Sequence, residues 1–209
     1  MPTAPPVKLV TFDLGGVFIR ISSGWEQAAK LANIKLPLLP KHEDVEPHLV
    51  KMETGNATEE DFCNRVAPLA GLAEEDVRSV LRAWLLGPYQ EIESIVDQLC
   101  EKRVATACLS NTNACHWKLM QEDGPNRLPL DRLTFRFASH LIGVMKPNAG
   151  IYEHLEQQTG VAPESILFFD DRPENCQAAR QRGWQAVQID PTGDTVKQMA
   201  TALRERSVI

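Results

Sequence analysis

The chain has 209 residues, of which 43% are apolar and 24% charged, and its formal net charge is −6. This length allows one domain, or a core with a small insertion. Nucleic acid is excluded as the main partner, because binding a phosphate backbone needs a clustered cationic face and the cations here are dispersed. No apolar run is long enough to span a bilayer, so no membrane partner is expected.

The five cysteines are scattered along the chain, without the short Cys–Cys or Cys–His spacings of metal sites. Such a set is typical of reduced thiols in a reducing compartment. The first residues lack the basic segment and the following apolar segment of a secretory signal. The sequence therefore predicts a cytoplasmic protein, and it gives no indication of the oligomeric state.

The first predicted element is the short apolar run Val7–Phe12, which ends at Asp13-Leu14-Gly15-Gly16. A β-rich run followed by turn-forming residues is typical of a buried strand. Four later runs have the same character, the second of them weaker: Val104–Leu109, Phe135–Ser139, Ile166–Phe169 and Trp184–Ile189. Helical patterns separate the strands, at Tyr89–Lys102, Asn113–Gln121, Ala149–Thr159, Pro173–Arg182 and Thr195–Arg204. This alternation predicts a three-layer, Rossmann-like α/β core with a parallel sheet in the strand order 3-2-1-4-5.

One long stretch, from Ser22 to Gly87, breaks the alternation because it holds several helix signals and no convincing strand. Thr58-Glu59-Glu60-Asp61 resembles a capping box, and apolar residues follow it at helical spacing. Ala73–Leu85 repeats the helical pattern. We therefore predict a core formed by residues 1–21 and 88–209, and a helical cap formed by residues 22–87. The alternative is that these helices cover one face of the sheet.

Four polar clusters lie where a predicted strand ends or the following helix begins. They are Asp13-Leu14-Gly15-Gly16, Ser110-Asn111-Thr112-Asn113, Lys146-Pro147 and Asp170-Asp171. Each cluster by itself is commonplace, since such residues also form turns and helix caps. The strand ends of an open α/β sheet, however, converge on one crevice, so the order and spacing of all four clusters predict one site.

The charges of these clusters indicate the chemistry. Asp13, Asp170 and Asp171 would place three carboxylates in one crevice, where they raise each other's pKa unless cations intervene. Lys146 supplies one positive charge, and a hard divalent cation bound by oxygens, such as Mg²⁺, supplies the rest. A carboxylate nucleophile, a lysine, a hydroxyl and a metal suit phosphoryl transfer, in which positioning and charge neutralisation do most of the catalysis.

In order and type, the four clusters resemble the four motifs of the haloacid-dehalogenase-like (HAD) superfamily, and the resemblance covers nearly the whole chain. It implies that Asp13 is the nucleophile that forms an aspartyl-phosphate. Ser110 and the amide of Asn111 match the groups that hold the phosphate. Lys146 matches the lysine that offsets charge on the nucleophile and the phosphate. The motifs look most like a bacterial subgroup with glucose-1-phosphate phosphatases, related to the N-terminal phosphatase domain of epoxide hydrolases.

The resemblance also implies a Mg²⁺ site formed by Asp13, the backbone carbonyl of Gly15 and the pair Asp170-Asp171, with Asp171 as the direct ligand. At Gly15 the chain departs from the usual phosphatase pattern, which has Asp there. That aspartate protonates the leaving group and later activates water, and general acid–base catalysis contributes about 10²- to 10⁴-fold. We therefore expect metal binding to persist and activity to be reduced, unless the leaving group departs unaided.

Three functions are compatible with Gly15. The first is a Mg²⁺-dependent phosphatase for a small phosphorylated metabolite; a sugar phosphate is favoured, because an anomeric oxygen leaves with little help. The second is a catalytically weak HAD-like protein that binds ligands or regulates a partner. The third is a 2-haloacid dehalogenase, although Asp170 and Asp171 would repel a haloacid. His116 is the first candidate for a substitute acid or base.

Overall fold

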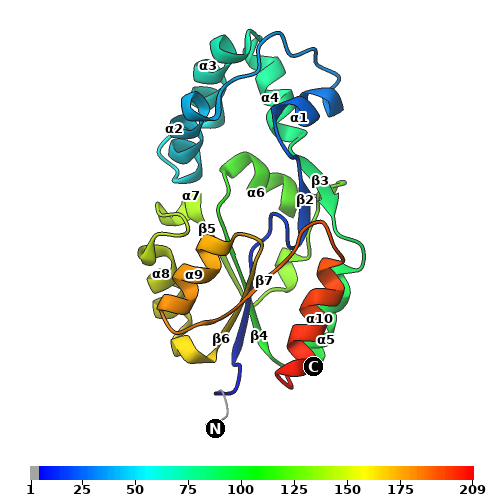
Figure 1. The fold of residues 1–209 in the computed structure, drawn as a ribbon, viewed down its shortest axis with the longest axis vertical. Coiled ribbons are helices and arrows are strands. Elements are labelled where there is room, and N and C mark those ends of the chain that lie inside the picture. The colour runs from blue at the N-terminus through cyan, green and yellow to red at the C-terminus, as the bar shows by residue number, and fades with distance from the viewer. Residues whose placement is uncertain (1–4) are drawn as a thin grey trace.

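The computed structural model describes residues 5–209, and its centre is a five-stranded parallel sheet in the order β5-β4-β1-β6-β7 (Figure 1). Numbered along the core, this is the predicted order 3-2-1-4-5, so the fold prediction is confirmed. The strands are β1 (Leu9–Phe12), β4 (Ala105–Ser110), β5 (Phe135–Ala138), β6 (Ile166–Asp170) and β7 (Gln185–Gln188). Because β1 lies between β4 and β6, the ends of these three strands are neighbours.

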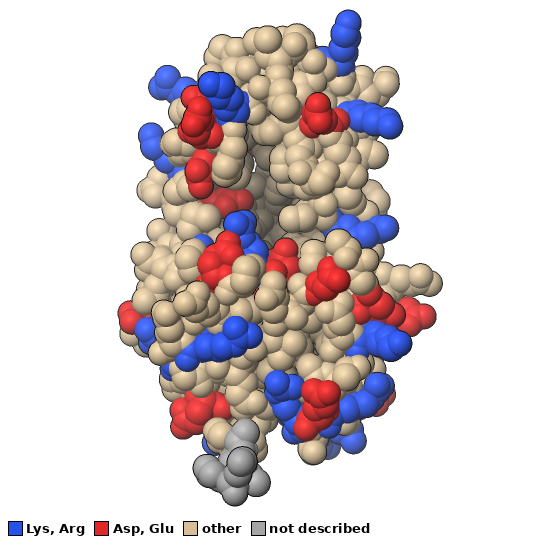
Figure 2. Space-filling view, in the orientation of Figure 1, with Lys and Arg blue, Asp and Glu red and all other residues tan. Residues whose placement is uncertain are grey.

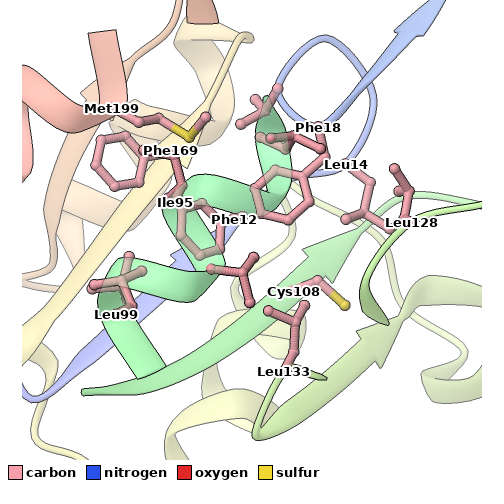
Figure 3. Packing of buried hydrophobic residues seen from close by; sticks show 14 of the residues in the cluster. Phe12, Leu14, Phe18, Ile95, Leu99, Cys108, Leu128, Leu133, Phe169 and Met199 are labelled. Carbon is pink, nitrogen blue, oxygen red and sulfur yellow. The ribbon is translucent and has the colours of Figure 1, made fainter. Parts of the chain in front are cut away.

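Helices cover both faces of the sheet. Alternate residues of the strands pack against α5 (Ile92–Glu101) and α10 (Thr195–Glu205) on one face, as Phe12 and Phe169 do in Figure 3. The other face packs against α8 (Ala149–Thr159) and α9 (Pro173–Gln181). Because the sheet is buried on both faces, the strand sequences are continuous apolar runs rather than alternating apolar and polar residues. Two shorter helices, α6 (Ala114–Gln121) and α7 (Ser139–Ile142), follow the ends of β4 and β5.

A unit of four helices is inserted after β1 and lies above the carboxyl ends of the sheet (Figure 1). The helices are α1 (Trp25–Leu31), α2 (His42–Glu53), α3 (Glu59–Ala70) and α4 (Glu74–Arg82). They bury a core of their own, which includes Val45, Phe62, Val66 and Val77. We call this unit the cap and propose residues 22–87 as its bounds.

Two short strands join the cap to the core, and the sequence did not predict either of them. They are β2 (Ile19–Ile21) and β3 (Leu85–Pro88), which pair antiparallel. The helix predicted at Ala73–Leu85 therefore ends at Arg82, because Leu85 pairs with Ile21. The capping box at Thr58 is present, with Asp61 in the place of the usual glutamate. No helix within residues 5–209 is both long and apolar enough to cross a membrane.

Candidate active site

The predicted site residues meet at the carboxyl edge of the sheet. Asp13 directly follows β1, Asp170 ends β6, and Lys146 lies just before α8. The Lys146 Nζ atom is 3.0 Å from Asp13 Oδ1 and 2.7 Å from Asp170 Oδ2. The side chain of Lys146 is fully buried, so the ion pairs are shielded from water. This Asp–Lys–Asp arrangement is the electrostatic centre of the site.

Two carboxylates, Asp13 and Asp170, contact the Lys146 ammonium group, and a third, Asp171, lies beside them, so negative charge exceeds positive charge. Single oxygens of Asp13, Asp170 and Asp171 lie within 4.8 Å of one another. The pKa of Asp13 is raised to about 7: burial is the largest cause, Lys146 lowers it, and the charges of Asp170 and Asp171 raise it. An all-oxygen cluster with more negative than positive charge fits a hard divalent cation such as Mg²⁺.

The two acids of the fourth motif have different surroundings. Asp170 is fully buried, and its carboxylate accepts hydrogen bonds from Lys146 Nζ, Asn175 Nδ2 and the backbone N–H of Arg172. Asp171 is only partly buried, and burial is the main cause that raises its pKa. Asp170 therefore holds Lys146 in place, whereas the carboxylate of Asp171 is the less constrained of the two.

The second motif supplies a buried hydroxyl and a structural amide. Ser110 is 2% exposed, and its Oγ has only a long 3.5 Å contact with the Asn111 carbonyl. The Asn111 side chain donates to the Lys146 carbonyl at 2.9 Å and accepts from the Lys146 N–H at 2.8 Å. Asn111 thus ties the lysine segment to the end of β4, while the Ser110 hydroxyl is available to a ligand.

Gly15 and Gly16, which follow Leu14, have different structural roles. A Cβ at Gly15 would meet only Ile21, at 3.6 Å, and the backbone there is not left-handed. Gly16 is left-handed, with φ +73°, and a Cβ would lie 2.7 Å from Asp171 Oδ2. Gly15 is therefore not required by backbone shape, whereas Gly16 is required by both its backbone and the position of Asp171.

A pocket separates this edge of the sheet from the cap, and Figure 2 shows a hollow there with charged side chains along its lower edge. Its volume is about 160 Å³. The pocket floor comes from the core, at Gly15, Ser110 and Asn111. Most of the wall is apolar: Ile19, Ile21, Trp25, Val45, Leu49, Phe62, Leu81, Trp84, Leu85 and Met120. Trp25 and Trp84 pack edge to face in it, with ring centroids 6.0 Å apart.

His116 lines the pocket but has no free ring nitrogen. Its Nε2 lies 2.8 Å from the carbonyl of Leu81, and its Nδ1 lies 3.2 Å from the Asn113 side-chain nitrogen. Because a carbonyl only accepts, Nε2 carries the proton and Nδ1 accepts from Asn113. Burial lowers the pKa of His116, so the neutral ring is favoured. His116 joins the core to the cap, and its geometry does not suit an acid or base.

Glu53 is a pocket residue that the sequence did not predict. It is the last residue of α2, and it is the only acidic residue that lines the pocket within residues 5–209. Its pKa is raised to about 7, because the effect of burial exceeds the lowering effect of the charges of Arg172 and Lys146. In the sequence Glu53 precedes a Thr-Gly helix end, which by itself indicates only a turn.

The chain thus has a parallel α/β core with a buried Asp–Lys–Asp cluster at its strand ends, beneath an inserted cap. Residues 7–183 match the family described as haloacid dehalogenase-like hydrolase, and the chain belongs to this family. A solved structure has the same fold: the magnesium complex of a HAD family enzyme from Bacteroides thetaiotaomicron. It has 20% sequence identity and a TM-score of 0.78, over 91% of this chain and 96% of that one.

Two curated proteins illustrate the range of relatives. The chain is 24% identical to a sesquiterpene phosphatase of Aspergillus oryzae over 204 residues, which are 97% of this chain and 96% of that protein. It is 23% identical over 210 residues to acyl-CoA dehydrogenase family member 10 of Mus musculus. That match covers 94% of this chain but 19% of the mouse protein, so the chain spans about a fifth of that relative.

Proposed function

We propose that the protein is a Mg²⁺-dependent phosphatase that acts on a small phosphorylated metabolite through an aspartyl-phosphate. The observation that carries this proposal is the contact of Asp13 with the buried Lys146, beside two further carboxylates. Asp13, the carbonyl of Gly15 and Asp171 would hold Mg²⁺, with Asp170 as a supporting residue. When bound, the metal would neutralise charge on the phosphate oxygens.

The other steps of the reaction are assigned to residues of the chain. Lys146 and the backbone N–H of Leu14, which donates to Asp13 Oδ1 at 2.7 Å, fix the orientation of the nucleophile. A carboxylate oxygen of Asp13 attacks phosphorus as the ester bond breaks, and water later releases the phosphate from Asp13. Ser110 Oγ and the main-chain amide of Asn111 would bind the phosphate oxygens. The excess of carboxylates disfavours a haloacid substrate.

For the substrate, we propose an apolar leaving group in place of the sugar that the family resemblance favours. A sugar brings several hydroxyls, and each one buried without a partner costs about 1–3 kcal/mol. Most of the pocket wall is hydrocarbon and aromatic surface. Its volume of about 160 Å³ is comparable with an apolar cavity of roughly 150 Å³ that binds benzene. The Aspergillus relative is a sesquiterpene phosphatase, and a sesquiterpene has a hydrocarbon skeleton.

A panel of phosphate monoesters tests this function. We expect kcat/KM for benzyl phosphate to exceed that for glucose 1-phosphate and glucose 6-phosphate by about 10-fold or more, because a few buried methylene-sized contacts supply that much discrimination. EDTA should abolish release of phosphate, and Mg²⁺ should restore it. Equal or better turnover of the sugar phosphates would contradict the apolar leaving group, and turnover unaffected by EDTA would contradict the metal.

Replacing Gly16 with alanine should weaken the metal site. The new Cβ would lie 2.7 Å from Asp171 Oδ2, so the carboxylate must move. We expect Mg²⁺ affinity, measured by calorimetry, to fall by about 10- to 100-fold, as when groups that orient metal ligands are lost. Gly160→Ala is the matched control, because Gly160 is also left-handed, with φ +66°, but has open space around it. Equal Mg²⁺ affinity in both variants would exclude Asp171 as a ligand.

A further inference from the structure

Glu53 presents a carboxylate from the cap to the pocket above the catalytic residues. It lines the same pocket as Gly15 and Ser110, although it is 38 residues from Gly15 in the chain. Its side chain is partly buried, and within residues 5–209 no hydrogen bond or ion pair holds it. A carboxylate without a protein partner beside an apolar wall is free to bond with a ligand in the pocket.

The end of α2 rests directly on the core, which fixes the place of Glu53. Gly55, two residues further on, is left-handed with φ +71°. A Cβ on Gly55 would lie 2.3 Å from the carbonyl oxygen of His140 in α7, so the two backbones are in close contact. No side chain fits between them. This contact holds the last turn of α2 against the edge of the sheet and keeps Glu53 over the site.

We propose that Glu53 is the general acid–base catalyst of the reaction, acting from the cap in place of a side chain at Gly15. This inference rests on the proposed phosphatase function. Glu53 donates its proton to the ester oxygen as the phosphorus–oxygen bond breaks and Asp13 becomes phosphorylated, so the product leaves as a neutral alcohol. The Glu53 carboxylate then takes a proton from the water that attacks phosphorus, which frees phosphate and the Asp13 carboxylate and restores the acid.

Three further observations support this role. The pKa of Glu53 is raised to about 7 by burial, against the lowering effect of the facing charges of Arg172 and Lys146. An acid with such a pKa is protonated often enough near neutral pH to act as a donor. The other titratable side chain that lines the pocket, His116, has both ring nitrogens engaged. Gly15 offers no side chain.

Two substrates of similar shape separate an acid from a structural residue. Benzyl phosphate releases an alkoxide that needs a proton, whereas 4-nitrophenyl phosphate releases a stable phenolate that does not. Glu53→Gln should lower kcat/KM for benzyl phosphate on the order of 10²- to 10⁴-fold and that for 4-nitrophenyl phosphate by less than about 5-fold. Glu46→Gln is the matched control: Glu46 lies on the same helix, is 56% exposed and pairs with His42. It should change neither rate.

A second variant moves the carboxylate back to the core. A Cβ at Gly15 makes only ordinary contacts and the backbone there is not left-handed, so we expect Gly15→Asp to fold. Combined with Glu53→Gln, it should restore turnover of benzyl phosphate by at least about 10-fold, because an acid again reaches the ester oxygen. In the presence of Glu53 the same substitution should have little effect. This rescue is not expected if Glu53 serves only to shape the pocket.

The outcomes separate the inference from the function on which it rests. If Glu53→Gln slows both substrates equally, or if Gly15→Asp fails to rescue benzyl phosphate in a folded double variant, Glu53 is not the acid, and the phosphatase function stands. If the wild-type protein with Mg²⁺ releases phosphate from neither ester, the proposed function is wrong and the inference falls with it. Circular dichroism of each variant establishes that it is folded.

Discussion

Replacing Asp13 with asparagine should lower phosphate release on the order of 10⁶-fold, the scale of loss when an enzyme loses its covalent nucleophile. The amide cannot form an acyl-phosphate, and it also removes one of the proposed metal ligands. The fold should persist, because Asp13 is a buried acid whose pKa is raised to about 7. Because this raised pKa already includes the effect of Lys146, the ionised carboxylate costs stability as pH rises through about 7, and the neutral amide does not.

Asp171→Asn is the informative comparison for this variant. Asp171 faces Gly16 rather than Lys146, so its loss should weaken the metal site and leave the nucleophile intact. Raising the Mg²⁺ concentration should therefore recover much of the activity of Asp171→Asn and none of that of Asp13→Asn. Labelled substrate should leave phosphate on the wild-type protein and on Asp171→Asn, but not on Asp13→Asn. A labelled Asp13→Asn protein would contradict the covalent mechanism.

The centre of the site was predictable from the sequence because it depends on topology alone. Parallel strands place their carboxyl ends at one edge, and β1 lies between β4 and β6. Once these strands are recognised in the sequence, Asp13 and Asp170 are predicted to lie close together. The contact of both with Lys146 follows from the same rule, because the lysine segment follows β5 and leads into α8. The strand order was also predictable, because it follows from the alternation of strands and helices along the chain.

The contributions of the cap were not predictable, because they depend on how two separately packed units meet. Glu53 reaches the pocket only because Gly55 lets the end of α2 approach the His140 carbonyl. No periodicity in the sequence encodes such a contact. The dual role of Asn111 is also invisible in sequence, since an Asn after a strand reads equally well as a turn former. The same applies to His116, whose ring nitrogens are engaged by Asn113 and the cap.

Some elements of the fold were missed for local reasons. The helix α2 begins after Lys41, which makes no side-chain cap, so the sequence has no helix start signal there. It also contains Pro47, which lowers its helix propensity. The strand β3 contains Gly87 and Pro88, residues that ordinarily argue against a strand. It exists because it pairs with β2 at the junction of cap and core. In each case a tertiary contact outweighed the local preference.

Replacing Lys146 with methionine should destabilise the protein by about 3–5 kcal/mol, the cost of leaving a buried charge without its partner. Methionine is similar in length and would keep contact with the Phe168 ring, which the lysine Nζ approaches at 5.3 Å from the centroid. What disappears is the charge between Asp13 and Asp170. A loss of this size is a large part of the 5–15 kcal/mol that stabilises a typical domain. Urea unfolding in EDTA measures it without interference from metal.

The size of this loss should depend on pH and on Asp170. With Lys146 present, the pKa of Asp13 is already raised from 3.8 to about 7, and removing Lys146 removes a charge that lowers it, so the pKa rises further. A carboxyl whose pKa is raised on folding lowers the free energy of unfolding fully when the pH is above its folded pKa, and not at all when the pH is below its unfolded pKa. The loss of stability caused by Lys146→Met should therefore be larger at about pH 8 than at about pH 5. Adding Asp170→Asn removes the unpaired buried charge and should recover about 2 kcal/mol. A deficit of less than about 1 kcal/mol at both pH values would mean that this ion pair contributes no more than an exposed one.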